Sequence, residues 1–274
     1  MKVLITVKTY PTPSLKYDEL VCTAGFKEDG SWIRIYPVPF RKLDYANQYK
    51  KWQWIDIRLE RNTSDFRPET FRPFNIDDDI QMLDRVGTED NWSRRKEIVL
   101  QHVHTNLGAL IKEAKDPAKR TSLAVFKPKE ITDFVWEPEE REWDKKKLDA
   151  IFAHRAQGDL FDGTGARNMF AVAEKIPYKF SYKFTTEDGM KSQLMIEDWE
   201  IGELFRSCRD QANGNEEVAC KKVKEKYFDY LYKERDLYFF LGTTKEFHNV
   251  APNPFIIIGT FYPPKTDHTQ LSLF

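Results

Sequence analysis

Aromatic and basic residues alternate in the stretch SWIRIYPVPFR, residues 31–41. In an extended strand, Trp32, Arg34 and Tyr36 point to one face and the two isoleucines between them point to the other. With the isoleucines in a core, the opposite face presents a guanidinium between two aromatic rings, which can stack on bases and bind phosphates. Arg41 follows at once. The pattern predicts a nucleic-acid-binding face, and the alternative is that Trp32 and Tyr36 are core residues under a helix, with Arg34 extended between them.

Two further arginines stand directly before prolines in SDFRPETFRPF. Arg67 and Arg72 are therefore restricted in backbone conformation, and fixed guanidinium groups suit phosphate recognition. Acidic neighbours offer the alternative partners: Asp65, Glu69 and the three aspartates of residues 77–79.

The same acidic residues could hold a divalent metal, because carboxylate oxygens are the ligands that hard cations prefer. Such a run is more often a solvated turn, so we expect no resident metal or other cofactor unless the protein is a nuclease. His102 and His104 fall in a predicted helix, where side chains two residues apart diverge. Glu197, Asp198 and Glu200 lie at a predicted strand-to-helix junction, where anions favour the helix start. Whether the chain is an enzyme is left open.

Composition restricts the class of protein. Among 274 residues, 43 Lys and Arg nearly cancel 44 Asp and Glu, so no overall basic field attracts a polyanion. Three cysteines at no metal-like spacing favour a reducing compartment over a disulfide framework. No apolar run is long enough to span a bilayer, and we therefore expect a cytoplasmic protein without a membrane partner.

Hydrophobic periodicity predicts an α+β fold: a mixed, mainly antiparallel N-terminal sheet with helices, then a second α/β half and an extended tail. The boundaries that we expect are 1–157, 176–264 and 265–274. Expected strands are 3–10, a hairpin around Asp29 and Gly30, 52–60, 178–184, and the apolar runs DLYFFLGT and FIIIGTFYP. Expected helices are 91–104, 106–115, 138–157, 198–212 and 216–233, with the glycine-rich stretch after residue 157 as a loop.

The chain ends in QLSLF, after a proline-marked run. This pentapeptide resembles the peptide by which bacterial replication and repair proteins bind the sliding clamp. The resemblance implies that Gln270 makes orienting amide hydrogen bonds, that Leu271 occupies a shallow site and that Ser272 faces outward. Leu273 and Phe274 would then fill the deep apolar pocket of the clamp groove. The alternative is an edge strand packed on the chain's own domain.

A looser match, QGDLF at residues 157–161, lacks the first leucine. The stretches ITVKTYPTPS, WIRIYPVPFR, DLYFFLGT and FYPP resemble an uncharacterised bacterial family, a resemblance that covers most of the chain and implies no activity.

We therefore expect a DNA-binding accessory factor, tethered to the sliding clamp, in bacterial replication, repair or conflict with phages and mobile elements. Its expected partners are the clamp and DNA, including single-stranded DNA. The alternatives are a metal-dependent nuclease or other nucleic-acid-processing enzyme, and an interaction module that does not bind DNA.

Overall fold

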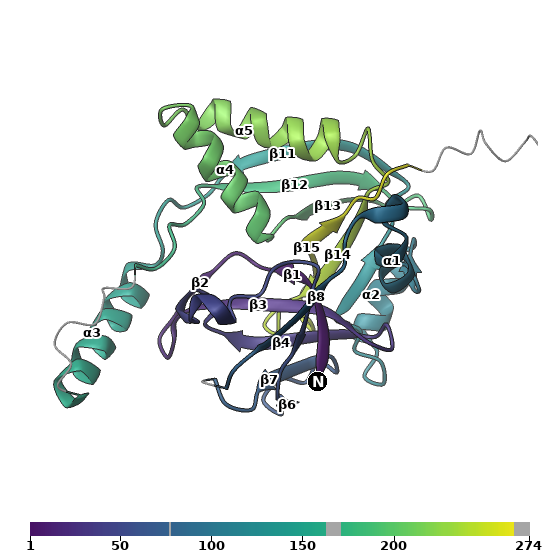
Figure 1. Cartoon of the computed structure of the whole chain (residues 1–274). Coiled ribbons are helices and arrows are strands. Elements are labelled where there is room, and N and C mark those ends of the chain that lie inside the picture. The colour runs from purple at the N-terminus through teal and green to yellow at the C-terminus, as the bar shows by residue number, and fades with distance from the viewer. Residues whose placement is uncertain (77, 163–170, 266–274) are drawn as a thin grey trace, which may run out of the picture.

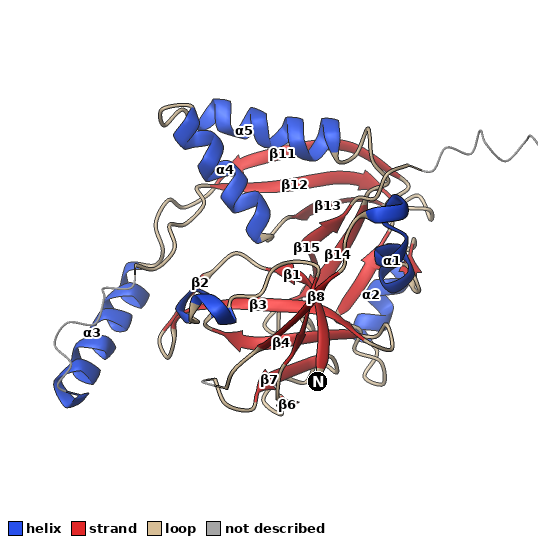
Figure 2. Ribbon diagram, in the orientation of Figure 1, coloured by secondary structure: helices blue, strands red, loops and turns tan. Residues whose placement is uncertain are grey.

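The computed structural model of the chain describes residues 1–76, 78–162 and 171–265, and it has the predicted α+β class (Figure 1, Figure 2). Three sheets make up the body of the described chain. Two of them stack on each other, and the third lies beside them under a pair of helices.

The largest sheet has the strand order β6-β7-β4-β3-β1-β5-β8, with β2 paired to β3. All its pairings are antiparallel except that of β4 with β7, which confirms the expectation of a mainly antiparallel N-terminal sheet. Its strands are β1 (Lys2–Lys8), β2 (Thr12–Ser14), β3 (Asp18–Lys27), β4 (Trp32–Val38), β5 (Gln53–Asp56), β6 (Leu59–Arg61), β7 (Thr70–Pro73) and β8 (Gln81–Arg85).

The predicted hairpin joins β3 to β4. Gly30 has a φ of +76°, a conformation that glycine adopts at little cost, and its N–H donates to the carbonyl of Lys27 at 3.0 Å. The predicted strand 52–60 is divided, because β5 pairs with β1 whereas β6 pairs with β7.

A second sheet, β15-β14-β10-β9, covers one face of the first. The apolar side chains of Leu4, Phe26 and Ala24 pack there with those of Phe240 and Ile258. The strands of this sheet are β9 (Val103–His104), β10 (Leu123–Phe126), β14 (Tyr238–Thr243) and β15 (Phe255–Phe261). The other face of the large sheet has a core of its own, which contains Val3, Ile5, Ile33 and Ile35.

The third sheet, β11-β12-β13, lies under α4 and α5 (Figure 1). Its strands are β11 (Glu130–Pro138), β12 (Tyr178–Thr185) and β13 (Lys191–Met195). The aromatic face predicted for residues 178–184 is confirmed, since Phe180, Tyr182 and Phe184 are at most 2% exposed. A bridge between Ile196 and Ile257 connects the end of β13 to β15.

The helices follow most of the local signals. The described α-helices are α1 (Glu89–Val99), α2 (Leu107–Lys115), α3 (Lys145–Asp162), α4 (Trp199–Gln211) and α5 (Glu216–Lys224), which continues as a π-helix (Glu225–Tyr230). Two short 3-10 helices, Phe40–Lys42 and Tyr45–Asn47, follow β4. The side chains of Asn106, Asp198 and Asn215 accept hydrogen bonds from the first turns of α2, α4 and α5, as N-cap residues do.

Two helix predictions are wrong. Residue 138 ends a strand instead of starting a helix, because β11 pairs with β12 as far as Pro138 and Tyr178, and α3 extends into the stretch predicted as a loop. His104 lies in β9, which pairs in parallel with β10, so the helix predicted to run to residue 104 ends at Val99. Strand pairing also runs across the predicted boundary at 157–176, since β10 pairs with β14 and β11 with β12.

Candidate functional site

A cleft lies where the three sheets and the start of α4 meet. It consists of two adjoining cavities of about 240 Å³ and about 330 Å³, and Tyr10, Thr12 and Glu197 line both of them. Three basic side chains contribute to the wall of the smaller cavity: Arg34, Arg67 and Lys245. The wall of the larger cavity includes the apolar and aromatic side chains of Trp143, Ile176, Tyr178, Phe180 and Ile201, together with the charged side chains of Glu139, Lys175 and Lys179.

Arg34 extends from β4 into the seam between the two stacked sheets and is 2% exposed. Its Nη1 donates to the hydroxyls of Thr70 at 3.1 Å and Ser122 at 2.8 Å. Its Nη2 donates to the carbonyls of Ser122 at 3.1 Å and Thr243 at 3.4 Å. Four of its five N–H groups are thus bound within the protein, and Arg34 holds the two sheets together.

Arg67 comes from the segment between β6 and β7 and is 5% exposed. Its Nε donates to Oδ1 of Asp65 at 2.9 Å, its Nη2 donates to Oδ2 of Asp65 at 2.6 Å, and its Nη1 donates to the carbonyl of Thr243. Three of its five N–H groups are used in these bonds, and the other two have no partner among the described residues. Because Arg67 also lines the smaller cavity, it can bind an anion there.

Charge in this seam is nearly balanced. Asp65 faces Arg67, and Glu69 accepts hydrogen bonds from the backbone N–H and the hydroxyl of Ser122 at 3.0 Å and 2.8 Å. Arg67 and Arg34 lower the pKa of Asp65, although its burial acts in the opposite direction. The cleft therefore has no large excess of positive charge, and the donors that it offers to an anion are the remaining N–H groups of Arg67 and the ammonium group of Lys245.

Two consecutive carboxyls lie at the junction of β13 and α4, the junction that the sequence predicts; Glu197 lines both cavities and Asp198 lines the larger one. Burial raises the pKa of Glu197, whose side chain forms no hydrogen bond or ion pair with another described residue. Asp198 is 2% exposed, and burial raises its pKa to about 7 despite the lowering effect of Lys51. Its Oδ1 caps α4, whereas its Oδ2 is buried, 4.0 Å from Nζ of Lys51, with no hydrogen-bond partner in the described chain.

Tyrosine side chains also line the cleft, and Tyr10 lines both cavities. Tyr10 follows β1; its hydroxyl donates to the carbonyl of Glu174 at 2.6 Å, and burial raises its pKa to about 12, so it is neutral at physiological pH. Tyr36 extends from β4 and is half-buried in the wall of the smaller cavity. Burial also raises the pKa of the Cys22 thiol nearby, which makes that thiol a poor nucleophile.

The structure brings only part of the predicted nucleic-acid face together. Arg34, Tyr36 and Arg67 share the smaller cavity, but the open face predicted for β4 is wrong because the second sheet covers it. Trp32 packs on Phe26, with ring centroids 4.1 Å apart. Arg41 lies outside the cleft and binds Glu19 at 2.6 Å, and Arg72 binds Glu60 at 2.6 Å.

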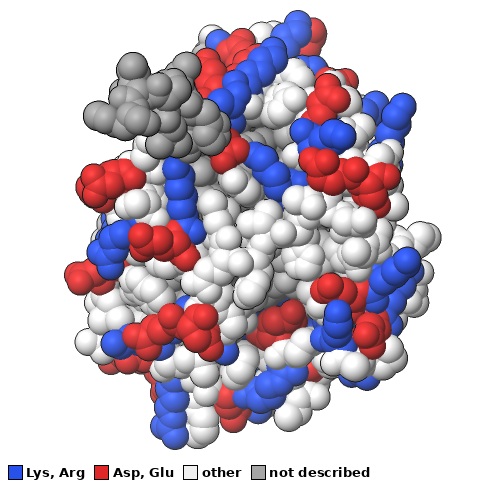
Figure 3. All heavy atoms as spheres, turned by 90° about the vertical axis from the view of Figure 1, so that its right-hand side faces the viewer, with Lys and Arg blue, Asp and Glu red and all other residues white. Residues whose placement is uncertain are grey.

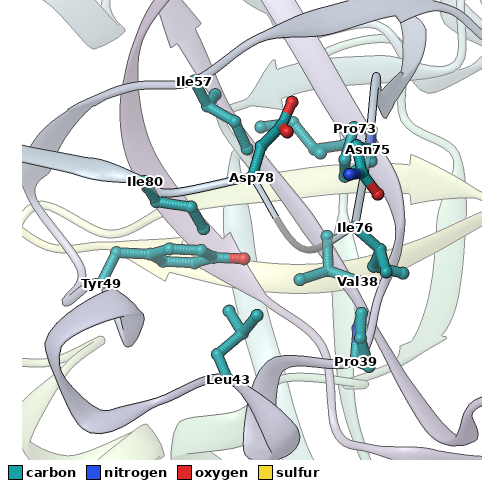
Figure 4. A pocket seen from close by; sticks show the side chains of 11 residues that line it. Val38, Pro39, Leu43, Tyr49, Ile57, Pro73, Asn75, Ile76, Asp78 and Ile80 are labelled. Atoms are coloured by element: carbon teal, nitrogen blue, oxygen red, sulfur yellow. The ribbon is translucent and has the colours of Figure 1, made fainter.

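Neither the acidic cluster nor the histidines form a metal site within the described residues. Asp65 and Glu69 are engaged with Arg67 and Ser122. Asp78 borders a cavity of about 10 Å³ whose other side chains are mostly apolar, among them Val38, Ile57 and Ile80 (Figure 4). That volume holds one water molecule at most, so this cavity is a packing defect and not a ligand site.

The predicted clamp-binding residues Gln270, Leu271, Ser272, Leu273 and Phe274 lie outside the described residues. The looser match at 157–161 falls within α3. On the face shown in Figure 3, lysines and arginines alternate with aspartates and glutamates around a broad uncharged area, so the described part of this face has no continuous basic patch. None of the described helices is both long and apolar enough to cross a membrane.

Tyr10, Thr12, Glu197 and Lys245 are cleft residues that the sequence did not identify as a site. The sequence predicts Glu197 beside a helix start. That Glu197 lines the same cavity as Arg67 depends on how the three sheets meet. A search of curated proteins finds no match. Residues 1–101 match a family described as a domain of unknown function (DUF8758), and residues 103–274 match a second, also described as a domain of unknown function (DUF8757). Because this second match spans more than half of the sequence, the chain belongs to the DUF8757 family.

Proposed function

We propose that the protein is a nucleic-acid-associated factor that holds one nucleotide unit of a single strand in the cleft and is tethered to the bacterial sliding clamp by residues 270–274. It would act in replication, repair or conflict with phages and mobile elements. The observation that carries the binding half of this proposal is the convergence of Arg67, Tyr10 and Tyr36 on one cleft.

The cleft has the size and the chemistry for a nucleotide. Its two cavities, of about 240 Å³ and about 330 Å³, together fall in the range of about 300–1,000 Å³ that is usual for small-molecule sites. Arg67 and Lys245 offer hydrogen-bond donors to a phosphate at one end. Trp143 and Tyr178 offer rings and apolar surface to a base at the other end. A single strand suits this arrangement better than a duplex, because a base must leave the stack to enter a cavity.

Equilibrium binding of fluorescently labelled single-stranded oligonucleotides, at low and at physiological ionic strength, tests this proposal. We expect Lys245→Ala to weaken binding and to flatten its salt dependence, since each phosphate contact releases counterions. We expect the paired change Asp65→Asn with Arg67→Gln to weaken binding about 10-fold or more, because charged hydrogen bonds contribute roughly 1.5–3 kcal/mol. The paired change avoids leaving the Asp65 carboxylate buried without its partner.

Arg72→Gln is the matched control, since Arg72 is exposed, lies on β7 outside the cleft and pairs with Glu60. Equal losses in the cleft variants and in this control would overturn the cleft as the binding site. If the wild-type protein does not bind the oligonucleotides even at low salt, the remaining alternative is an interaction module that does not bind nucleic acid. Strand cleavage that requires a divalent metal would favour the nuclease.

A further inference from the structure

Glu197 occupies the junction of the two cavities. Its backbone position is fixed on both sides: its N–H donates to the carbonyl of Ile257 at 2.8 Å, Ile196 bridges to Ile257, and Asp198 caps α4. The side chain is half-buried and lines both cavities, and its carboxyl has no hydrogen-bond partner among the described residues. A partly buried carboxyl without a partner is costly in the free protein, and a ligand that donates hydrogen bonds would relieve that cost.

The position of Glu197 along the cleft defines which part of a nucleotide it meets. Arg67 lines only the smaller cavity, Tyr178 and Trp143 line only the larger one, and Tyr10, Thr12 and Glu197 line both. In the proposed binding mode, with the phosphate at Arg67 and the base in the larger cavity, the sugar would therefore lie beside Glu197. A carboxylate only accepts hydrogen bonds. The groups of a sugar that donate them are its hydroxyls, and within a strand the 2′-hydroxyl is the free one, which distinguishes RNA from DNA.

We propose that Glu197 accepts a hydrogen bond from the 2′-hydroxyl of the bound unit and that the cleft therefore selects ribose over deoxyribose. This inference rests on the proposed nucleotide-binding function and specifies its ligand as a ribonucleotide unit. A deoxyribose in the same position leaves the carboxyl unpartnered again, and a site built to bind a hydroxyl rejects the analogue that lacks it.

Oligo(U) and oligo(dU) of equal length differ only in the 2′-hydroxyl, so their dissociation constants test the inference directly. We expect the wild-type protein to bind oligo(U) about 10-fold or more tightly than oligo(dU). We expect Glu197→Ala to remove this preference by weakening oligo(U) binding while leaving oligo(dU) binding nearly unchanged. Glu197→Gln keeps one accepting oxygen and should retain part of the preference.

Glu139→Gln is the control, because Glu139 lines only the larger cavity and lies 4.0 Å from the ammonium groups of Lys175 and Lys179. It should retain the full preference for ribose. Equal binding of the two oligonucleotides by the wild-type protein, or an unchanged preference in Glu197→Ala, would overturn this inference alone. Binding of neither oligonucleotide would overturn the proposed function as well. Thermal unfolding of Glu197→Ala checks that the variant folds, which we expect because the carboxyl has no partner to lose.

Discussion

Arg34 and Arg67 differ in how much of each guanidinium is committed within the protein. Arg34 uses four N–H groups on Thr70, Ser122 and Thr243, whereas Arg67 retains two for a ligand. The sequence predicts both as phosphate contacts because residue type and strand alternation are local properties. The partners of Arg34 lie as far as 209 residues away, and no local pattern reveals them. The face of a residue can thus be predicted, but the layer that covers that face cannot.

Asp198 gives a prediction about pH. Its pKa is raised by burial to about 7, above the usual 3.8, so the folded state holds this proton more tightly than the unfolded state does. Between about pH 4 and pH 7 this group therefore makes the protein less stable as the pH rises. This decrease in the free energy of unfolding amounts to roughly 2–4 kcal/mol by pH 8. We expect Asp198→Asn to remove it, because asparagine does not ionise and still caps α4. Urea unfolding of both proteins across this pH range measures the difference.

Asp229→Asn serves as the control for this measurement, because Asp229 is half-exposed and pairs with Lys233 on the surface at 2.6 Å. Its effect on stability should be small at every pH. Parallel stability curves for the wild type and Asp198→Asn would show that Asp198 is ionised without cost in the folded protein.

Elements with strong local signals were predicted well. Helix α2 begins after Asn106 and ends before Pro117, and the hairpin forms at Gly30, because caps, prolines and turn residues act on their neighbours. The errors involve pairing at a distance. Strand β9 is only two residues long and exists because Val103 pairs with Val125. The carboxyl end of β11 is a strand because Pro138 pairs with Tyr178, in spite of the acidic residues that suggested a helix start.

The prediction for a single element concerns α4, which packs closely on Tyr10. A Cβ on Gly202 would lie 2.4 Å from ring carbons of Tyr10, whose hydroxyl is held at Glu174. We expect Gly202→Ala to displace the ring, to lower stability by about 1–3 kcal/mol and to weaken oligonucleotide binding. In a Tyr10→Ala background the same change should be neutral or stabilising, since alanine favours a helix over glycine. Urea unfolding of the wild type, of each single variant and of the double variant measures the free energies of unfolding for this double-mutant cycle.

Gly108→Ala in α2 is the helical control, because the nearest atom to its Cβ would be 3.4 Å away, an ordinary contact. It should not destabilise the protein. An equal penalty for Gly202→Ala with and without the Tyr10 ring would show that this ring does not limit the approach of α4.

At the scale of the whole molecule, the cleft lies between the two regions of the chain that match the two families. Arg34, Tyr36 and Arg67 belong to residues 1–101, whereas Glu197, Asp198 and Lys245 belong to residues 103–274. The apolar core beneath them is also shared, since Leu4 and Phe26 pack with Phe240 and Ile258. Composition and periodicity predict the α+β class, but a site built from both regions depends on sheet stacking. For this reason the sequence singles out the arginines and, separately, the carboxyls at the start of α4, but it does not predict that Arg67 and Glu197 line the same cavity.

The proposed clamp tether is a prediction for the whole molecule, because it would act independently of the cleft. The described chain is held to the body as far as Lys265: the carbonyl of Pro263 accepts from the N–H of Asp236 at 2.9 Å, and Nζ of Lys265 donates to the carbonyl of Lys233 at 2.6 Å. Residues 270–274 lie beyond this point in the sequence. We expect the paired change Leu273→Ala with Phe274→Ala to weaken binding to a purified bacterial sliding clamp more than 10-fold, since burying each side chain contributes roughly 1.5–3 kcal/mol. Surface plasmon resonance measures this affinity. Ser272→Ala should bind as the wild type does, and all three proteins should bind oligonucleotides equally. If the paired variant binds the clamp as tightly as the wild type does, or if the wild type does not bind it, residues 270–274 are not a clamp tether. Either result leaves the proposal of nucleotide binding in the cleft unaffected, because the oligonucleotide assay tests that proposal separately.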